Sequence, residues 1–152
     1  MHHMIARRTA RWAFDRLSER DVAPLLARCA EDIHHQFAGD HALGGVRHSK
    51  RAISEWLDRL YRLFPELGFE AHSVLVKGPP WHMIVAVLWT DRGKAADGEA
   101  YENQGVHELQ IRWGKLVSLR AHLDTQHLVG VLDRMAGNGV TEAEAAPIGA
   151  KP

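Results

Sequence analysis

Apolar and polar residues alternate along residues 101–113, a pattern that predicts a β-strand with one buried face and one wetter face. A second alternating run covers residues 116–123, so the two are expected to form an antiparallel hairpin with its turn at residues 113–115. The buried face of the first strand also carries two polar residues, Asn103 and His107. A packed core has no need for such a pair, whereas a strand lining a small-molecule cavity does.

Helical periodicity accounts for much of the remaining chain. The clearest helix is expected to begin after Ser49, which can cap it, and to end before Pro65. Its apolar stripe consists of Ile53, Trp56, Leu57, Leu60, Tyr61 and Phe64. Further helices are predicted at residues 4–18 and 22–30, and a last helix begins at Asp124 or the residue after it.

Additional strands are expected at residues 33–37, 68–76 and 82–90, the last nearly all apolar and therefore central in a sheet. The order of elements predicts an α+β fold, in which a strongly curved antiparallel sheet wraps around the long helix to form a cone. Residues 1–140 are assigned to this domain. Residues 141–152 form a C-terminal tail that is expected to pack only on a neighbouring molecule.

Charge and cysteine content narrow the possible partners. Lysine plus arginine equals aspartate plus glutamate, 19 each, which favours neither nucleic acid nor a membrane as partner. The one cysteine, Cys29, rules out an intramolecular disulfide and favours a cytoplasmic protein. No apolar segment typical of a signal peptide is present, and the longest apolar run, residues 83–89, is too short to span a bilayer.

Eleven histidines raise the question of a metal site. The chain contains neither an HxH pair nor an HExxH motif, and Cys29 has no second thiol to pair with. Glycine-rich phosphate-binding motifs are also absent. We therefore expect neither a metal nor a cofactor.

A series of motifs follows a glycine-bearing loop in a characteristic order along the chain. They are LYRLFPEL (residues 60–67), VLVKGPPW (74–81), VAVLWTD (85–91), DGEAYENQGVHELQIRWGKLVSLRAHLDTQ (97–126) and NGVTEAEAAPI (138–148). In this order and spacing they resemble the SnoaL-like side of the nuclear transport factor 2-like superfamily. The resemblance implies the cone fold and an apolar pocket in which burial raises the pKa of a catalytic carboxyl group toward neutrality.

The resemblance also indicates where family enzymes carry their acids. The position of the ketosteroid isomerase base is occupied here by Phe37, and the last-strand position of the epoxide hydrolase acid is occupied by Ala121. The strand-end acid of SnoaL-type polyketide cyclases matches Asp124. Asp124 could instead cap the last helix. The alternation of the last strand places Asp124 on the same outward face as His122, which favours the capping role.

Two histidines join Asp124 as catalytic candidates. His107 and His35 both lie on the apolar parity of their strands, where each could transfer a proton or could be a core histidine bonded to backbone. Candidate ligand-binding residues, each also a possible core residue, are Asn103, Trp56, Tyr61, Trp89, Phe37 and Trp113.

Two functions from different classes follow. The first is a SnoaL-like isomerase, cyclase or dehydratase acting on a small hydrophobic polyketide-, steroid- or terpenoid-like compound. The second is a non-catalytic ligand-binding or assembly domain, favoured because the isomerase base and epoxide hydrolase triad are missing. A homodimer is expected through the outer sheet face, which carries Gln104, Val106, Glu108, Gln110 and Arg112.

Overall fold

The computed structural model describes residues 1–150. Its elements follow one another as α1 (His2–Glu19), α2 (Ala23–Ala27), β1 (Cys29–Phe37), β2 (Gly45–Arg47), α3 (Lys50–Leu63), β3 (Gly68–Lys77), β4 (Met83–Lys94), β5 (Ala100–Arg112), β6 (Lys115–Leu123), α4 (Thr125–Gly137) and the short 3-10 helix η1 (Thr141–Glu144). The predicted α+β class is confirmed.

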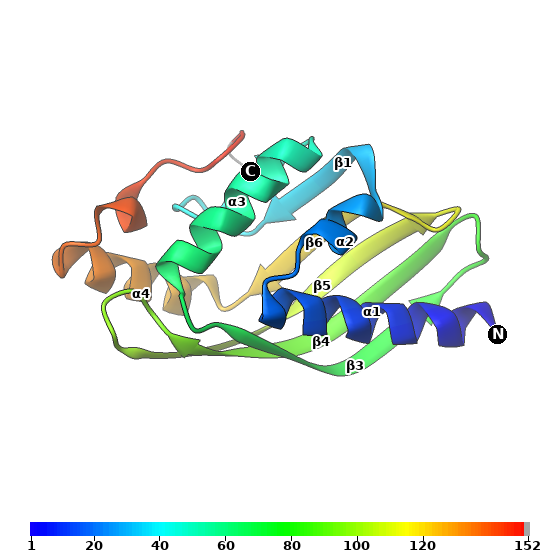
Figure 1. The fold of residues 1–152 in the computed structure, drawn as a ribbon, viewed down its shortest axis with the longest axis horizontal. Helices are drawn as coiled ribbons and strands as arrows, with labels where there is room; N and C mark the ends of the chain where they lie inside the picture. Colours follow the sequence, from blue (N-terminus) through cyan, green and yellow to red (C-terminus); the bar gives the residue numbers. More distant parts are fainter. Residues whose placement is uncertain (151–152) are drawn as a thin grey trace.

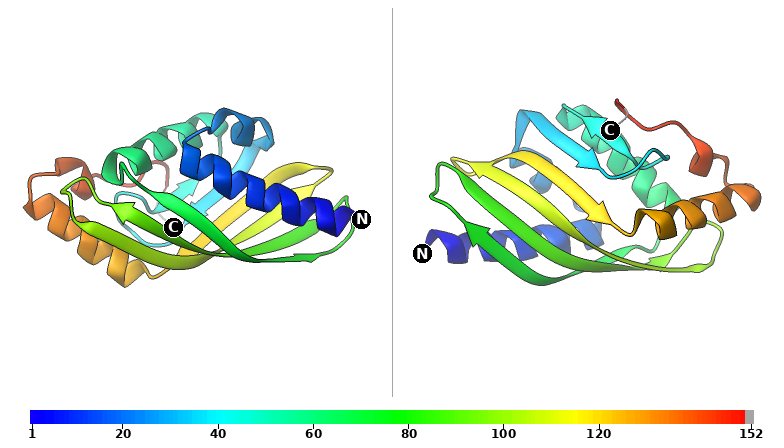
Figure 2. Two further views of the ribbon diagram at one scale, coloured as in Figure 1. Left: turned by 60° about the horizontal axis from the view of Figure 1, so that its bottom comes forward. Right: turned by 180° about the vertical axis from the view of Figure 1, so that it is seen from behind.

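One curved, unclosed sheet forms the framework (Figure 1). Its strand order is β2-β1-β6-β5-β4-β3, with α1, α2 and α3 on one face and α4 at the end of β6 (Figure 2). All neighbouring strands are antiparallel except β1 and β6, which run parallel. The predicted curved antiparallel sheet is therefore confirmed, with one parallel pair that forms because β6 reaches β1 only after the chain has passed through α3 and β3 to β5.

Helix α3 forms as its periodicity predicts. The Ser49 hydroxyl accepts a hydrogen bond from the backbone N–H of Ala52 at 3.1 Å, which caps the first turn. The helix buries a stripe of Ile53, Trp56, Leu57, Leu60 and Leu63. This stripe packs in one buried core with Ile33 and Phe37 of β1, and most of its residues line the interior cavity described below.

The first two helices and β1 differ from the predicted boundaries. Helix α2 ends at Ala27, and Cys29 begins β1, because strand β6 pairs with this segment from Leu116 onward. A short strand, β2, lies inside the expected glycine loop and pairs with the end of β1. Both corrections arise from pairing with distant strands, which local propensity does not report.

The C-terminal segment packs on its own chain, which corrects the expectation that it docks only on a neighbour. Val46 and Ala150 exchange backbone hydrogen bonds of 2.8 and 2.9 Å. Ala143 is buried in the core, and the Arg62 guanidinium donates to both carboxylate oxygens of Glu142. The described part of the tail therefore closes one edge of the domain.

Candidate active site

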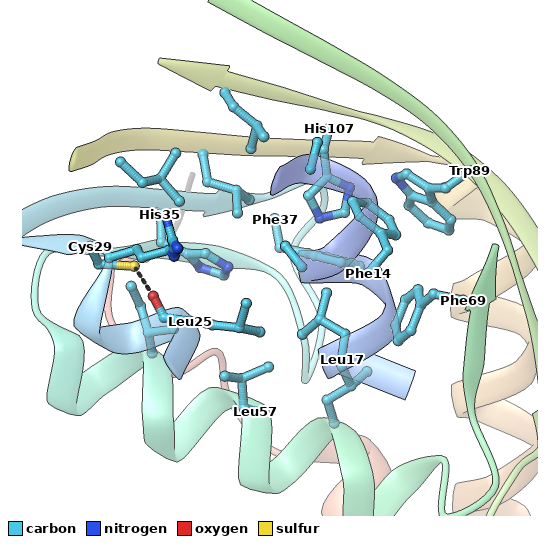
Figure 3. A pocket seen from close by; sticks show the side chains of 18 of the residues that line it. Phe14, Leu17, Leu25, Cys29, His35, Phe37, Leu57, Phe69, Trp89 and His107 are labelled. Atoms are coloured by element: carbon cyan, nitrogen blue, oxygen red, sulfur yellow. Dashed lines mark hydrogen bonds between the residues drawn. The ribbon is translucent and has the colours of Figure 1, made fainter. Parts of the chain in front are cut away.

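A cavity of about 190 Å³ lies between the sheet and helices α1, α2 and α3 (Figure 3). Most of its lining is apolar, with Leu25, Leu57 and Phe69 among the side chains that surround it. Among the described residues that line it, only Arg28 and Gly114 are exposed. Both residues lie where the end of α2 meets the β5–β6 turn, so the lining reaches the surface there, and we take this point as the mouth of the cavity.

Strands β4 and β5 supply the polar part of the lining. Asp91, Trp89 and His107 come from neighbouring positions on these strands, and all three line the cavity. Each carries one buried polar atom without a hydrogen-bond partner among the described residues: Oδ1 of Asp91, Nε1 of Trp89 and Nδ1 of His107. Because an unpartnered buried polar atom is costly, these three residues form the polar and energetically unfavourable part of an otherwise apolar lining.

Within residues 1–150, Asp91 is the one carboxyl group in the cavity lining, and only 5% of the residue is exposed. Burial raises the pKa of Asp91 to about 7, with the backbone N–H groups of Asn103 and of Asp91 itself opposing the shift and Glu102 adding to it. The group can therefore hold or release a proton near neutral pH. That is the property required of a general acid or base.

Aromatic rings surround His107 in the same cavity. The His107 ring contacts the rings of Phe14 and Trp89, with centroids 5.2 and 5.4 Å away (Figure 3). Trp89 lies across Gly105, where an added Cβ would come within 2.7 Å of the indole. Glycine at this position thus leaves room for the indole to lie flat over β5. Burial lowers the pKa of His107 to about 4, so its ring is neutral at pH 7.

His35 enters the cavity from β1 and is oriented by Arg47. The Arg47 Nε–H donates to Nδ1 of His35 at 2.9 Å, so a neutral His35 carries its proton on Nε2. Burial, and then the charge of Arg47, hold the pKa of His35 well below its usual range. The His35 ring packs 4.8 Å from that of Trp56.

Arg47 is only 1% exposed and pairs with no carboxylate among the described residues. Its guanidinium instead donates to the carbonyl oxygens of Gly44, Gly45 and Ile148 at 2.8 to 2.9 Å. Burial lowers the pKa of Arg47 to about 10, which still leaves it charged at neutral pH. A positive charge therefore lies directly behind the His35 ring.

Five of the residues predicted from sequence line the cavity, namely His35, His107, Phe37, Trp56 and Trp89. Asp124 is not among the lining residues. It is exposed, and its Oδ1 accepts a hydrogen bond from the backbone N–H of His127 at 3.0 Å, which caps α4. Of the two roles predicted for Asp124, the structure shows the capping role that strand parity favoured, and Asp124 does not line the cavity.

The other three ligand-binding candidates also lie outside the lining. Asn103 donates to the carbonyl oxygen of Asp124 and accepts from the backbone N–H of Gln104, so it joins β5 to the start of α4. The Tyr61 hydroxyl donates to the carbonyl oxygen of Leu17 at 2.8 Å. Trp113 is 76% exposed at the tip of the β5–β6 hairpin.

Sequence reasoning missed Asp91 and Tyr101, which both line the cavity. The signal for Asp91 was present in the parity of β4, since Val85, Val87 and Trp89 point inward and Asp91 continues the series. The Tyr101 ring packs 4.4 Å from Phe64, and burial, then the nearby Asp91, raise the pKa of its hydroxyl. Tyr101 therefore remains a neutral phenol beside the acid.

Two negative findings apply to residues 1–150. No group of histidine, cysteine, aspartate and glutamate side chains has the arrangement of a metal site within this range. The helices of the same range are also too short or too polar to cross a membrane.

Comparison with known proteins gives one family. A family model described as a SnoaL-like domain matches residues 10–119. No curated protein matches the chain.

Solved structures with the same fold are numerous but distant in sequence. An NTF2-like protein of unknown function from Burkholderia pseudomallei is 20% identical, with a TM-score of 0.72 over 82% of this chain and 95% of that one. PrhC from Penicillium brasilianum is 14% identical, with a TM-score of 0.77 over 93% of each chain. TerC, co-crystallised with polyporic acid, is 16% identical, with a TM-score of 0.65 over 80% of this chain and 92% of that one. Identities this low establish a shared fold and leave the reaction open.

Proposed function

The chain belongs to the SnoaL-like domain family, and on that premise we propose that it is an acid/base enzyme that moves a proton on a small hydrophobic carbonyl compound. The observation that carries the proposal is Asp91, a buried carboxyl group with a pKa of about 7 inside an otherwise apolar cavity. Asp91 replaces Asp124 as the proton carrier. His35 and His107 keep their predicted places in the site as neutral polar groups.

Proton abstraction next to a carbonyl group is the reaction that this arrangement serves best. The Asp91 carboxylate takes the proton from the carbon, and the electron pair moves onto the carbonyl oxygen to give an enolate. The carboxylic acid formed then returns the proton to a second carbon of the same molecule. The net change is an isomerisation. When the enolate carbon instead attacks a second carbonyl group, the new C–C bond closes a ring and the Asp91 carboxylic acid gives its proton to the alkoxide oxygen. In both cases Asp91 ends as a carboxylate.

The enolate oxygen needs a hydrogen-bond donor, and His35 supplies a suitable one. Its Nε2–H is free of the Arg47 contact, which uses Nδ1, and the ring lines the cavity. Because Arg47 is charged, it increases the positive potential at this donor as negative charge develops on the substrate.

Cavity size restricts the substrate. At about 190 Å³ the cavity is slightly larger than an engineered cavity of roughly 150 Å³ that holds benzene. A substrate of one ring or two fused rings matches this space, as in a monoterpenoid or a small aromatic polyketide. A four-ring steroid is too large unless the walls move apart.

Asp91→Asn is the central test. The purified protein would be incubated in D2O with a panel of one- and two-ring enones, and deuterium incorporation next to the carbonyl measured by NMR. Loss of a general base is expected to slow exchange by about 10² to 10⁴-fold. Asp124→Asn, which retains a capping side chain, serves as the matched control and is expected to exchange at the wild-type rate.

A binding domain without catalysis is the competing function, and the largely apolar lining favours it. Saturable binding of the same compounds without any enzyme-dependent exchange would establish it. Equal exchange by wild type and Asp91→Asn would instead remove Asp91 from the mechanism.

We also propose the homodimer through the outer sheet face. The exposed side chains of Leu75, Ile84 and Leu88 lie on β3 and β4, beside the mixed polar face of β5. Sedimentation of Ile84→Glu against wild type tests this, with a shift to monomer expected. A cytoplasmic location remains a prediction from the single cysteine, which is free and buried at the start of β1.

A further inference from the structure

Three segments distant in sequence meet at the cavity mouth. Nε2 of His3 donates to the carbonyl oxygen of Gly78 at 2.8 Å, which joins the start of α1 to the β3–β4 turn. The backbone N–H of Trp113 donates to the carbonyl oxygen of Pro80 at 3.3 Å, which joins that turn to the β5–β6 turn. Figures 1 and 2 show the N-terminus beside the β3–β4 turn in each view. We call residues 1–14, 77–84 and 109–118, together with Arg28, the mouth end.

The mouth end carries only one sign of charge on its side chains. Its basic residues are Arg7, Arg8, Arg28, Lys77, Arg112 and Lys115, and its segments contain no aspartate or glutamate. Arg11, in the same helix segment, instead donates to the carbonyl oxygen of Ala71 in the middle of β3. Glu31, which lies near Lys115 at the start of β1, is paired with Lys50 at 2.8 Å. Because the whole chain has zero formal charge, the fold has concentrated positive charge at this end.

The same end also exposes large apolar side chains. Trp81 and Trp113 are 55% and 76% exposed, with ring centroids 6.0 Å apart. Met4 and Ile5, on the first turns of α1, are more than half exposed as well. Exposed tryptophans beside basic side chains are typical of surfaces that insert into the headgroup region of a bilayer.

Trp113 lies in a backbone conformation that does not suit it. Trp113 and Gly114 form a two-residue hairpin turn with φ of 50° and 79°, and such a turn favours asparagine followed by glycine. A bulky residue at positive φ is uncommon and unfavourable. Since the exposed indole gains little from the fold, its place at the tip points to a contact outside the chain.

The cavity opens at this same end, because its two exposed lining residues, Arg28 and Gly114, both belong there. We propose that the mouth end is a docking surface for an anionic lipid bilayer, on which Trp81 and Trp113 insert and the basic side chains contact lipid phosphates. This is a surface contact rather than a membrane span. It goes beyond the proposed function, and it gives an apolar ligand a path from lipid to cavity without passing through water.

A bilayer fits this surface better than nucleic acid does. Phosphate groups would satisfy the basic side chains in either partner, but a duplex offers no apolar layer for two adjacent indoles and an exposed Met4. The balanced net charge of the sequence gave no indication of either partner, because charge segregation is a property of the fold.

The test uses the full-length protein and vesicles of phosphatidylcholine, with and without phosphatidylserine. Binding is measured by co-sedimentation and by the blue shift of tryptophan emission. We expect binding to the phosphatidylserine vesicles that weakens as salt is raised. The double variant Arg7→Gln/Arg8→Gln is expected to bind these vesicles more weakly by roughly fivefold for each basic residue removed. Arg92→Gln/Lys94→Gln, at the opposite end of β4, removes the same charge and should bind as wild type does.

The indoles have their own variant, Trp81→Ser/Trp113→Asn. Asparagine suits the turn, so the hairpin is retained while both rings are removed. Vesicle binding is expected to fall on the order of tenfold. Unchanged vesicle binding by this variant, or binding to duplex DNA in place of vesicles, would overturn the proposal. Neither readout depends on turnover, so failure here is distinct from failure of the proposed chemistry.

Discussion

The Nε–H of Arg47 donates to Nδ1 of His35 at 2.9 Å, and this contact fixes the tautomer of the histidine, while burial and then the charge of Arg47 hold its pKa well below the usual range. Arginine cannot accept a hydrogen bond, so the imidazole proton must be on Nε2, at the far side of the ring. The cation is held by backbone carbonyl groups rather than by an acid, so its charge is not neutralised by a partner carboxylate. The pair therefore presents a neutral donor backed by a positive charge.

Asp91→Asn is expected to stabilise the protein at neutral and alkaline pH. The pKa of Asp91 rises from an ordinary value of 3.8 to about 7 on folding, so between these values the folded state binds more protons than the unfolded state. The contribution of Asp91 to the free energy of unfolding therefore falls as the pH rises from about 4 to 7. We expect a gain of about 1 to 3 kcal/mol at pH 8 that disappears toward pH 4. Urea unfolding across pH measures it, and a pH-independent difference would contradict the assignment.

His107→Gln is expected to reduce the loss of unfolding free energy that occurs as the pH falls below about 6.5. Here the folded pKa of about 4 lies below the ordinary 6.5, so the unfolded state binds more protons in this window. Stability from this group is complete above pH 6.5 and is lost as the pH falls toward 4. The variant should keep about 2 kcal/mol more of its neutral-pH stability at pH 4.5 than wild type does.

The matched control for that experiment is His82→Gln, since His82 is exposed in the β3–β4 turn. The unfolding free energy of this variant should fall at acid pH as that of wild type does. Parallel curves for the His107 variant and wild type would show that His107 does not titrate in this way.

Arg47→Met is expected to destabilise the protein by about 3 kcal/mol, because three carbonyl oxygens and Nδ1 of His35 lose their donor inside the domain. The carbonyl oxygen of Ile148 is among them, so limited proteolysis should release the C-terminal segment sooner than in wild type. Arg51→Met, at a 90% exposed side chain on α3, should change neither property. An Arg47 variant as stable as wild type would show that the buried cation is dispensable.

Asp124→Ala is expected to cost about 1 kcal/mol through loss of the α4 cap, whereas Asp124→Asn should be nearly neutral. Thermal unfolding measures both. Turnover lost in Asp124→Asn at wild-type stability would return Asp124 to the list of catalytic acids.

The fold was largely predictable, since α3 and the β5–β6 hairpin follow their periodicity almost residue by residue. The residues of the candidate site were harder to predict. Asp91-Arg92-Gly93 has the composition of a turn, yet β4 continues to Lys94 because β5 pairs with it across the whole segment. The role of Arg47 could not be predicted for a different reason. Its hydrogen bond to the carbonyl oxygen of Ile148 joins residues 101 positions apart, and no local sequence pattern indicates such a contact. The parity of β6, in contrast, was enough to favour Asp124 as a cap.

The proposed chemistry requires that the carboxyl group of Asp91 exchange its proton near neutral pH. A carbon-13 NMR titration of the aspartate carboxyl groups, with Asp91→Asn used to assign the resonance, measures this directly. We predict a midpoint near pH 7 for Asp91, as its burial requires. A midpoint near 4 would show an ordinary solvated carboxylate and would contradict the account of the site.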